Sequence, residues 1–563
     1  MSADIPIALV LIVGAAFVPF TRGTLRAVYT LALPLVAFAW LLALPSGEFG
    51  ELQVLGHTLI LMRVDRLSLL FGYVFLIAAF INAIYALHVE DTTQHVAGLV
   101  YAGSALGAVF AGDLLTLFVY WELTAVSSVL LVWARATERA YRAGMRYVVV
   151  QLASGMLLLA GAALHLNEGG TLYFGELGLD TLGSYLILGA FGIKCAFPLL
   201  HNWLQDAYPE ATVTGTVMLS AFTTKLGIYA LARGYPGTEM LIWIGTVMTA
   251  FPIFYAVIEN DLRRVLAYSI NNQLGFMVVG IGIGTELALN GAVAHAFADI
   301  IFKALLFMSM GAVLLRTGTV NGSDLGGLYK SMPWTAGFCI VGAASISGFP
   351  LFSAFVTKSM IMVAAADQGY LWVWLVLLFA SAGVLEHAGI KIPYFAFFAH
   401  DSGIRCKEAP SNMLVAMAVA AALCIGIGVF PGALYAVLPF PVEYEPYTFT
   451  HVVIQLQLLV FAVLAVFFLM RVGIYPAELR ATNLDFDWLY RRAAPSVAYR
   501  VAEWLSALLR GAARLVSFAG SRIATRVYRH HGPEGLLART RPTGSMALWA
   551  MLMLLAYLVI NYL

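Results

Sequence analysis

The chain has 563 residues, of which 61% are hydrophobic and 11% charged, and its formal net charge is +1. Soluble domains carry about 25% charged residues, so this composition excludes an ordinary soluble protein. A net charge so close to zero gives no electrostatic reason to expect a nucleic-acid partner. Apolar runs of about 20 residues recur from end to end, and each is long enough to cross a lipid bilayer. The composition therefore predicts an all-α, multi-pass membrane protein.

We expect about 14–16 transmembrane helices, with boundaries uncertain by a few residues. In chain order, the candidate spans are residues 5–21, 27–45, 67–89, 94–112, 113–134, 143–166, 181–200, 212–232, 238–258, 262–284, 287–316, 333–366, 369–391, 412–433, 451–471 and 545–563. The first lacks the basic start and the cleavage site of a signal peptide, so it is interpreted as a retained span.

Two of these spans contain helix-breaking residues. Residues 333–366 are too long for one straight crossing and include Gly348 and Pro350, whereas the seventh span carries Pro198 close to Lys194. Interrupted helices at matching places in two halves are typical of inverted-repeat transporters. We therefore predict two inverted five-helix repeats, residues 94–232 and 238–391. They follow three N-terminal spans (1–93) and precede C-terminal spans at 412–472 and 545–563.

Basic residues gather in alternate short loops, which predicts the orientation in the membrane. The loops after the fifth, ninth and thirteenth spans hold Arg135, Arg139, Arg142, Arg146, Arg263, Arg264, Arg405 and Lys407. These loops are predicted to be cytoplasmic, which places the N-terminus on the outer face of the cell (inner) membrane.

Residues 473–543 form a different kind of segment. They contain many arginines, and between Pro495 and His530 the apolar residues recur at helical spacing. This pattern predicts an amphipathic helix that lies along the cytoplasmic interface. It would serve either as an anchor for the final span or as a brace against neighbouring subunits.

Ionisable residues inside the apolar spans are the candidate functional site: Glu122, Lys194, Lys225, His295, Asp299, Lys303 and Lys358. A charge at the centre of a spanning helix costs about 2.5–3.5 kcal/mol on insertion scales. So many such residues either pair for stability or move charge through the bilayer. A lysine alone can also snorkel to the interface, an alternative that suits Lys358 best.

The relative positions of these residues suggest a proton relay. Glu122 and Lys194, on different spans, would stabilise each other's charges when close, and separating them would favour release of a proton from the lysine. The alternative is a static ion pair. His295, Asp299 and Lys303 follow one another at i, i+4 spacing on one helix face, where intervening water could carry a proton.

Five motifs in this order carry a family resemblance: Gly112–Leu123, Lys194–Ala207, Asp261–Ser269, Phe302–Phe307 and Ser347–Ser353. Together they resemble the antiporter-like family, which comprises the large subunits of Mrp sodium/proton antiporters and the antiporter-like membrane subunits of respiratory complex I. The resemblance spans about residues 65–400.

The resemblance implies a role for each matched residue. Glu122 and Lys194 match the coupling pair, and Lys225 matches the relay lysine of the eighth span. The matches in the second half are a polar relay position at His295 and exit-side lysines at Lys303 and Lys358. The acidic Asp299 is more similar to the D-type Mrp subunits, whereas the long C-terminal amphipathic segment is more similar to the distal complex I subunit.

These patterns favour a proton-translocating subunit of a multisubunit cation (sodium)/proton antiporter, most similar to the D-type subunit of Mrp complexes. The partners expected are the other subunits of the complex, protons, the lipid bilayer and, as a candidate second ion, sodium. The alternatives are a pumping subunit of complex I, of a membrane-bound hydrogenase or of a related assembly, and a scaffold subunit that transports nothing. Four scattered cysteines and the lack of nucleotide, haem or flavin motifs predict no metal site and no cofactor, so any redox chemistry would belong to partners.

Overall fold

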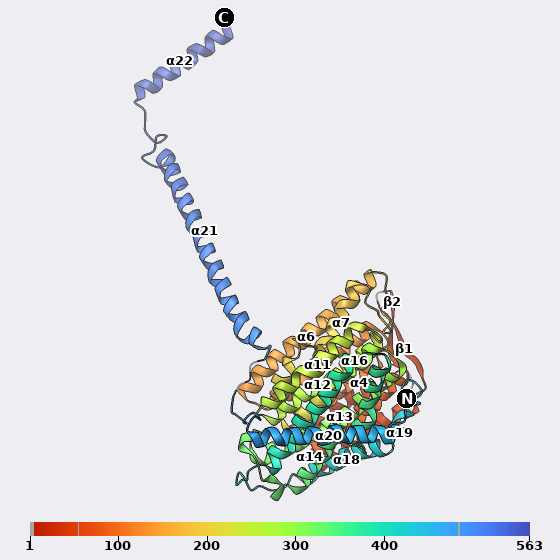
Figure 1. The fold of residues 1–563 in the computed structure, drawn as a ribbon. Helices are drawn as coiled ribbons and strands as arrows, with labels where there is room; N and C mark the ends of the chain where they lie inside the picture. Colours follow the sequence, from red (N-terminus) through yellow and green to blue (C-terminus); the bar gives the residue numbers. More distant parts are fainter. Residues whose placement is uncertain (1–4, 55, 482, 484, 563) are drawn as a thin grey trace. The chain divides into compact units, whose positions relative to one another are not determined.

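The computed structural model describes residues 5–54, 56–481, 483 and 485–562 (Figure 1). The chain divides into two compact units, residues 1–483 and 484–563. Within the described residues, 11 helices are long and apolar enough to cross a membrane, and shorter apolar helices accompany them. Every predicted span contains at least one helix, so the predicted all-α, multi-pass fold is confirmed.

The N-terminal part holds α1 (Ala8–Phe17), α2 (Gly23–Ala43) and α3 (Arg66–Tyr85). Between α2 and α3, β1 (Gly47–Val54) and β2 (His57–Val64) form an antiparallel hairpin that the sequence analysis did not predict. The hairpin packs on the start of the fifth span, where the Gly112 amide donates to the Ile60 carbonyl (3.0 Å). Asp65 then starts α3 by accepting a hydrogen bond from the Ser68 amide, in a capping box.

The first predicted repeat comprises α4 (Thr92–Phe110), α5 (Leu114–Trp133), α6 (Glu138–Asn167), α7 (Leu182–Lys194), α8 (Asn202–Ala207), α9 (Val213–Ala221) and α10 (Thr223–Gly234). The second comprises α11 (Glu239–Ile258), α12 (Leu262–Ile283), α13 (Glu286–Thr317), α14 (Pro333–Ser347), α15 (Ser353–Asp367), α16 (Leu371–Val384), the π-helical turn η5 (Leu385–Ile390), α17 (Lys391–Pro393) and a further π-helical turn, η6 (Tyr394–Phe398). The first unit continues with α18 (Ser411–Val429), α19 (Pro431–Tyr435) and α20 (Phe449–Val472).

A short backbone pairing recurs in both halves. Asp113, which caps α5, pairs with Tyr173, and Asp261, which caps α12, pairs with Asn321. The same number of residues separates the two partners in each half. This recurrence is what two copies of one helical unit would produce, and it supports the predicted repeats, which remain a prediction.

The predicted interruptions in the seventh and twelfth spans are present. The chain leaves α7 at Lys194 and reaches α8 only at Asn202, and it breaks between α14 and α15 around Gly348, which has φ +70°. A further break at Phe222 separates α9 from α10 and was not predicted.

Each break frees backbone carbonyls that the bilayer cannot solvate, so side chains must satisfy them. The indole of Trp203 donates to the Ile193 carbonyl (3.0 Å), and the Asn271 amide donates to the Ala196 carbonyl (2.6 Å). The breaks therefore create buried polar positions in the middle of the helical body.

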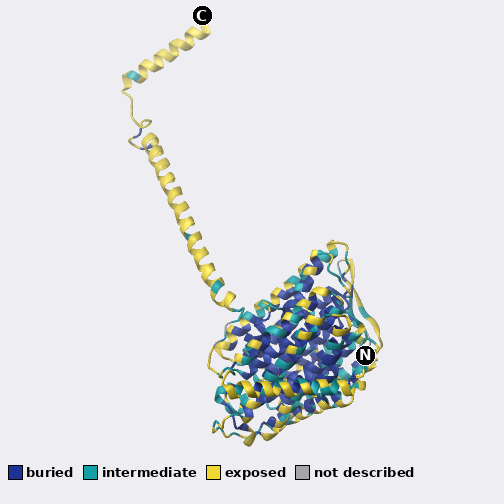
Figure 2. Cartoon of the chain, viewed as in Figure 1, coloured by how far each residue is buried: buried dark blue, intermediate teal, exposed yellow. Residues whose placement is uncertain are grey.

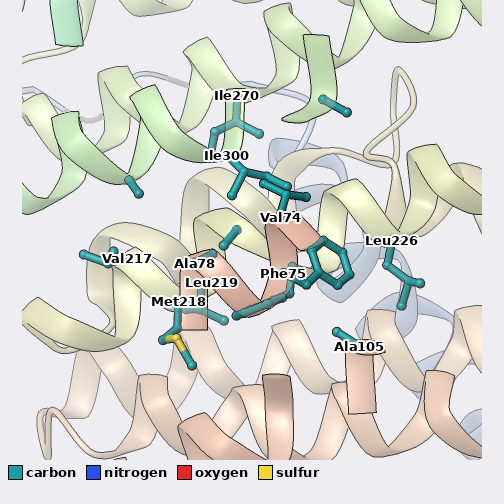
Figure 3. Close-up of a cluster of buried hydrophobic side chains, with 14 of the residues drawn as sticks. Val74, Phe75, Ala78, Ala105, Val217, Met218, Leu219, Leu226, Ile270 and Ile300 are labelled. Atoms are coloured by element: carbon teal, nitrogen blue, oxygen red, sulfur yellow. The ribbon is translucent and has the colours of Figure 1, made fainter. Parts of the chain in front are cut away.

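The centre of the first unit is densely packed (Figure 2). In the most apolar 18-residue stretch of α12, 94% of the residues are buried, and in that of α13, 89% are buried. Side chains on these two helices therefore lie deep inside the protein. Figure 3 shows that α3 contributes Val74, Phe75 and Ala78 to a buried cluster that also contains Leu219 of α9, Ile270 of α12 and Ile300 of α13. Since lipid is as apolar as these side chains, close packing rather than exclusion of water holds them together.

The second unit contains α21 (Ala494–His531) and α22 (Thr543–Tyr562). Within this unit, α21 is an amphipathic helix that carries six arginines. Its bounds agree with the amphipathic helix predicted between Pro495 and His530.

Candidate functional site

Glu122 lies on α5 and faces α6. The residue is half-buried, and its carboxylate rests against Gly155, where an added Cβ atom would overlap the carboxylate oxygen Oε1. The glycine is therefore what allows the carboxylate to occupy the interface between these two helices.

We predict that Gly155→Ala lowers proton translocation strongly, because the new methyl group must push the Glu122 carboxylate away from α6. Transport and assembly of the purified complex would be measured together. Gly189→Ala on α7 is the matched control, since nothing lies within 4 Å of a Cβ added there. A Gly155→Ala variant with normal transport would show that the position of the carboxylate is unimportant.

Lys194 ends α7 and is fully buried. Its ammonium donates to the Trp121 carbonyl (2.7 Å) and to the Thr124 hydroxyl (2.6 Å), and it lies 4.1 Å from the centroid of the Trp121 ring. These partners flank Glu122 on α5. In the part of the chain that the structure describes, Lys194 and Glu122 interact electrostatically but form no ion pair within 4 Å. The ammonium also benefits from the negative end of the α7 dipole.

Lys225 pairs with Asp299 of α13. The ammonium and carboxylate are 2.6 Å apart, and both side chains are fully buried. The ammonium also donates to the Ser220 carbonyl (3.0 Å), which the break at Phe222 leaves near the lysine. The pair joins the two predicted repeats. Spacing along one helix could not predict it, because its members lie on different helices.

His295 and Lys303 both reach from α13 to α12. The His295 ring bridges the Thr357 hydroxyl (Nδ1, 3.0 Å) and the Gln273 amide oxygen (Nε2, 2.9 Å), and Lys303 donates to the Ser269 hydroxyl. His295 also contacts α15 through Thr357, whereas Asp299, between His295 and Lys303, contacts Lys225 of α10. The predicted stripe is therefore divided among three neighbouring helices, α12, α15 and α10.

Lys358 lies on α15 and is 5% exposed, so its ammonium does not snorkel to an interface. It donates to the Ile346 carbonyl (3.3 Å) beside the α14–α15 break and lies 4.9 Å from the centroid of the Phe276 ring. It also lines a mostly apolar cavity of about 390 Å³, together with Tyr444 and Gln455.

A set of hydroxyl groups lies between α5 and α10 and was missed by the sequence analysis. Ser128 contacts the Tyr147 hydroxyl (2.8 Å), which lies 3.5 Å from the Thr223 hydroxyl, and Thr223 also contacts Tyr101 (2.5 Å). Ser128 is one turn beyond Thr124, whose hydroxyl accepts a hydrogen bond from Lys194. Thr223 is two residues before Lys225. Sequence analysis considered only ionisable residues, although tyrosines inside apolar runs were a usable signal.

The ionisable side chains of the site are of kinds that can carry protons. Among residues 5–54, 56–481, 483 and 485–562, no group of three or more His, Cys, Asp and Glu side chains is arranged to hold a metal ion. Lysine, histidine and carboxylate groups connected by hydroxyls can instead gain and lose protons without large movements.

Comparison with known proteins identifies relatives that match between about half and three quarters of the chain. The family described as "NADH:quinone oxidoreductase/Mrp antiporter, TM" matches residues 111–385. The chain is 32% identical over 286 residues to the D subunit of the Na(+)/H(+) antiporter of Alkalihalophilus pseudofirmus, a match covering 47% of this chain and 58% of that protein. It is 30% identical over 459 residues to the N subunit of the NADH-quinone oxidoreductase of Desulforudis audaxviator, covering 73% of this chain and 90% of that protein.

A solved structure has the same fold. A chain of the membrane-bound sulfane sulfur reductase, an archaeal respiratory membrane complex, is similar with a TM-score of 0.68 at 26% identity, covering 77% of this chain and 95% of that chain. The chain spans only 58–63% of the length of several other curated relatives, the antiporter D subunit included. The match to the N subunit extends over nearly all of that relative. The chain therefore belongs to the family of membrane subunits that NADH:quinone oxidoreductases and Mrp antiporters share.

Proposed function

We propose that this chain is the proton-translocating, antiporter-like subunit of a multisubunit cation/proton antiporter, most similar to the D-type Mrp subunits, with sodium as the exchanged cation. The observation that carries the proposal is the series of buried ionisable side chains across both predicted repeats: Lys194, Lys225 with Asp299, His295, Lys303 and Lys358. Because buried charges are expensive in a membrane, a series of this length has functional value.

The proton path runs along Lys225, His295 and Lys303 to Lys358. A proton enters from the cytoplasmic side and moves through water between the helices, because these groups are not in direct contact along the whole route. Lys225 is held in an ion pair with Asp299, so transfer onward requires the pair to loosen.

Lys194 and Glu122 gate this path. In the present arrangement the ammonium is held by the Trp121 carbonyl and the Thr124 hydroxyl. A shift of the ammonium toward Glu122 forms a full ion pair, and the shift back weakens it. This alternation changes the field at the hydroxyl groups leading to Lys225, and therefore the ease with which that lysine releases its proton.

The family of the chain supports a proposal about its membrane and its partner subunits. We propose that it works in the cell (inner) membrane with its N-terminus on the outer face, next to the other subunits of the complex. The division into repeats at residues 94–232 and 238–391 is part of this proposal, since each half then contains one of the two predicted interrupted spans, the seventh and the twelfth.

The proposal is tested with the complex, extracted gently from its native membrane and reconstituted into vesicles. Small antiporter subunits should copurify, and added sodium should drive proton movement across the vesicle membrane. Copurification of quinone-reductase or hydrogenase subunits, with no response to sodium, would contradict the Mrp assignment.

The second candidate is a proton-pumping subunit of complex I, of a hydrogenase or of a related assembly. The long amphipathic α21 followed by the apolar α22 favours it, as does the extended match to an N subunit. In that case proton movement should follow electron transfer in the partner subunits. A scaffold role predicts instead that neutralising Lys194 disrupts assembly.

A further inference from the structure

The thirteenth predicted span contains a second cluster of buried ionisable groups. After α16 the helix widens into the π-helical turn η5, which carries Glu386 and His387, and Lys391 begins α17. None of these residues belongs to the predicted relay. π-Helical turns inside helices are frequent at functional sites.

His387 is fully buried, and among the described residues no side chain is hydrogen-bonded to either of its ring nitrogens. The ring lies close to the backbone of Gly383, and a buried polar side chain with so few partners is uncommon. The charges of Lys303, Lys358 and Lys391 all act on this ring. His387 is therefore within electrostatic range of the exit-side lysines of the relay and of the lysine that follows it on its own helix.

Lys391 is held firmly at the end of α11. Its ammonium donates to the carbonyls of Ala256 (3.2 Å), Val257 (2.6 Å) and Glu259 (2.7 Å) and forms an ion pair with Glu478 (2.9 Å). These contacts satisfy the carbonyls left free where α11 ends. The lysine is therefore an anchor for the carboxylate rather than a mobile carrier.

Three carboxylates gather around this anchor. Glu386 is half-buried and accepts a hydrogen bond from the Tyr475 hydroxyl (2.7 Å), whereas its second oxygen has no partner among the described residues. Glu478 is 7% exposed, and Glu259 accepts a hydrogen bond from Asn483 and lies 3.9 Å from Arg264. The cluster lies where α11 meets α12, at the loop predicted to be cytoplasmic.

The predicted repeats place Lys391 on the helix that corresponds to the one carrying Lys225. Each lysine lies on the fifth helix of its half, and each follows an interruption of that helix, at Phe222 and at η5. Each pairs with a buried carboxylate from another part of the chain, Asp299 or Glu478. The second half thus repeats the type of site at which the first half is proposed to take up protons.

We propose that Glu386, Glu478 and His387 form a second proton path, which joins the face at the α11–α12 loop to Lys303. This inference rests on the proposed function, because it supplies protons to the same relay. A protonated Glu386 passes its proton to a ring nitrogen of His387 and becomes a carboxylate. The imidazolium then passes a proton to the neutral amine of Lys303, through water where the groups are not in contact, and charge is conserved at each step.

The test uses the complex with its own partner subunits, reconstituted into vesicles. His387→Gln preserves the size and polarity of the side chain but cannot carry a proton, so it is expected to lower proton flux about tenfold or more with normal assembly. Glu386→Gln keeps the contact with Tyr475 and should cause a smaller loss, because Glu478 remains. That loss should grow as the pH rises, since proton capture becomes limiting, whereas a structural defect gives the same fractional loss at every pH.

Matched controls separate the possible outcomes. His165→Gln, at a half-buried histidine of α6, and Glu443→Gln, at a loop glutamate, should leave the flux unchanged. If Lys194→Met stops transport while His387→Gln and Glu386→Gln behave like these controls, the second path is wrong and the proposed function stands. If Lys194→Met transports normally, the proposed function itself is wrong. If the complex with His387→Gln fails to assemble, the test rests on Glu386→Gln. Unchanged proton flux in that variant at every pH then overturns the second path.

Discussion

Replacing Lys194 with methionine is expected to abolish proton translocation while leaving the complex assembled. Methionine fills nearly the same volume, and among the described residues Lys194 forms no ion pair within 4 Å, so the substitution leaves no broken buried pair behind. The Trp121 carbonyl and the Thr124 hydroxyl would lose their ammonium partner, and the gate could no longer alternate. Loss of a proton-transfer group of this kind lowers rates by about 10²–10⁴-fold.

The measurement is the rate of proton movement into vesicles that contain the complex, with assembly followed by native electrophoresis. Lys407→Met is the matched control, because this lysine lies in a loop outside the spans. Glu122→Gln should reproduce the defect, since a neutral amide attracts the ammonium far less than a carboxylate does. A complex that falls apart when Lys194 is neutralised would favour the scaffold role.

The second large effect concerns the Lys225–Asp299 pair, which should contribute to both stability and transport. Asp299→Leu leaves the ammonium buried without its carboxylate. Breaking a buried pair from one side destabilises proteins by about 3–5 kcal/mol. We therefore expect the single variant to have a clearly lower midpoint of thermal unfolding than the wild type.

The double variant Lys225→Met/Asp299→Leu separates these two roles. With both charges removed, apolar packing should restore most of the lost stability, but transport should stay absent because the relay lacks its lysine. Thermal unfolding of the detergent-solubilised complex and proton flux in vesicles test the two halves of this prediction. A double variant that still transports protons would show that Lys225 is not part of the path. An Asp299→Leu variant as stable as the wild type would show that the ion pair contributes little to the free energy of unfolding.

Both experiments concern residues that the sequence analysis identified without predicting all of their contacts. It identified Lys194, Lys225, Asp299 and Lys303 as notable because each interrupts an apolar run. It paired Asp299 with the stripe on its own helix, since spacing along a helix is visible in a sequence. The rotation of α10 against α13 is not visible there, and that rotation brings Lys225 to the carboxylate.

The cluster at Lys391 was missed for a related reason. Lys391 is at the very end of a predicted span, where a lysine is ordinarily interpreted as solvated. Its burial depends on Glu478, which comes from the segment after α20. Nothing in the local pattern of either segment indicates that they meet.

The sequence by itself therefore determined the all-α membrane fold, the order of the spans, the breaks near Pro198 and Gly348, and the amphipathic α21. Each of these follows from hydrophobicity and backbone preference within a short stretch of chain. Only the tertiary structure decided which buried charges meet, that Lys194 rests on the Trp121 carbonyl, and that hydroxyl groups lie between α5 and α10. These contacts depend on how whole helices are rotated and packed against one another, and that arrangement is set by side chains far apart in the sequence.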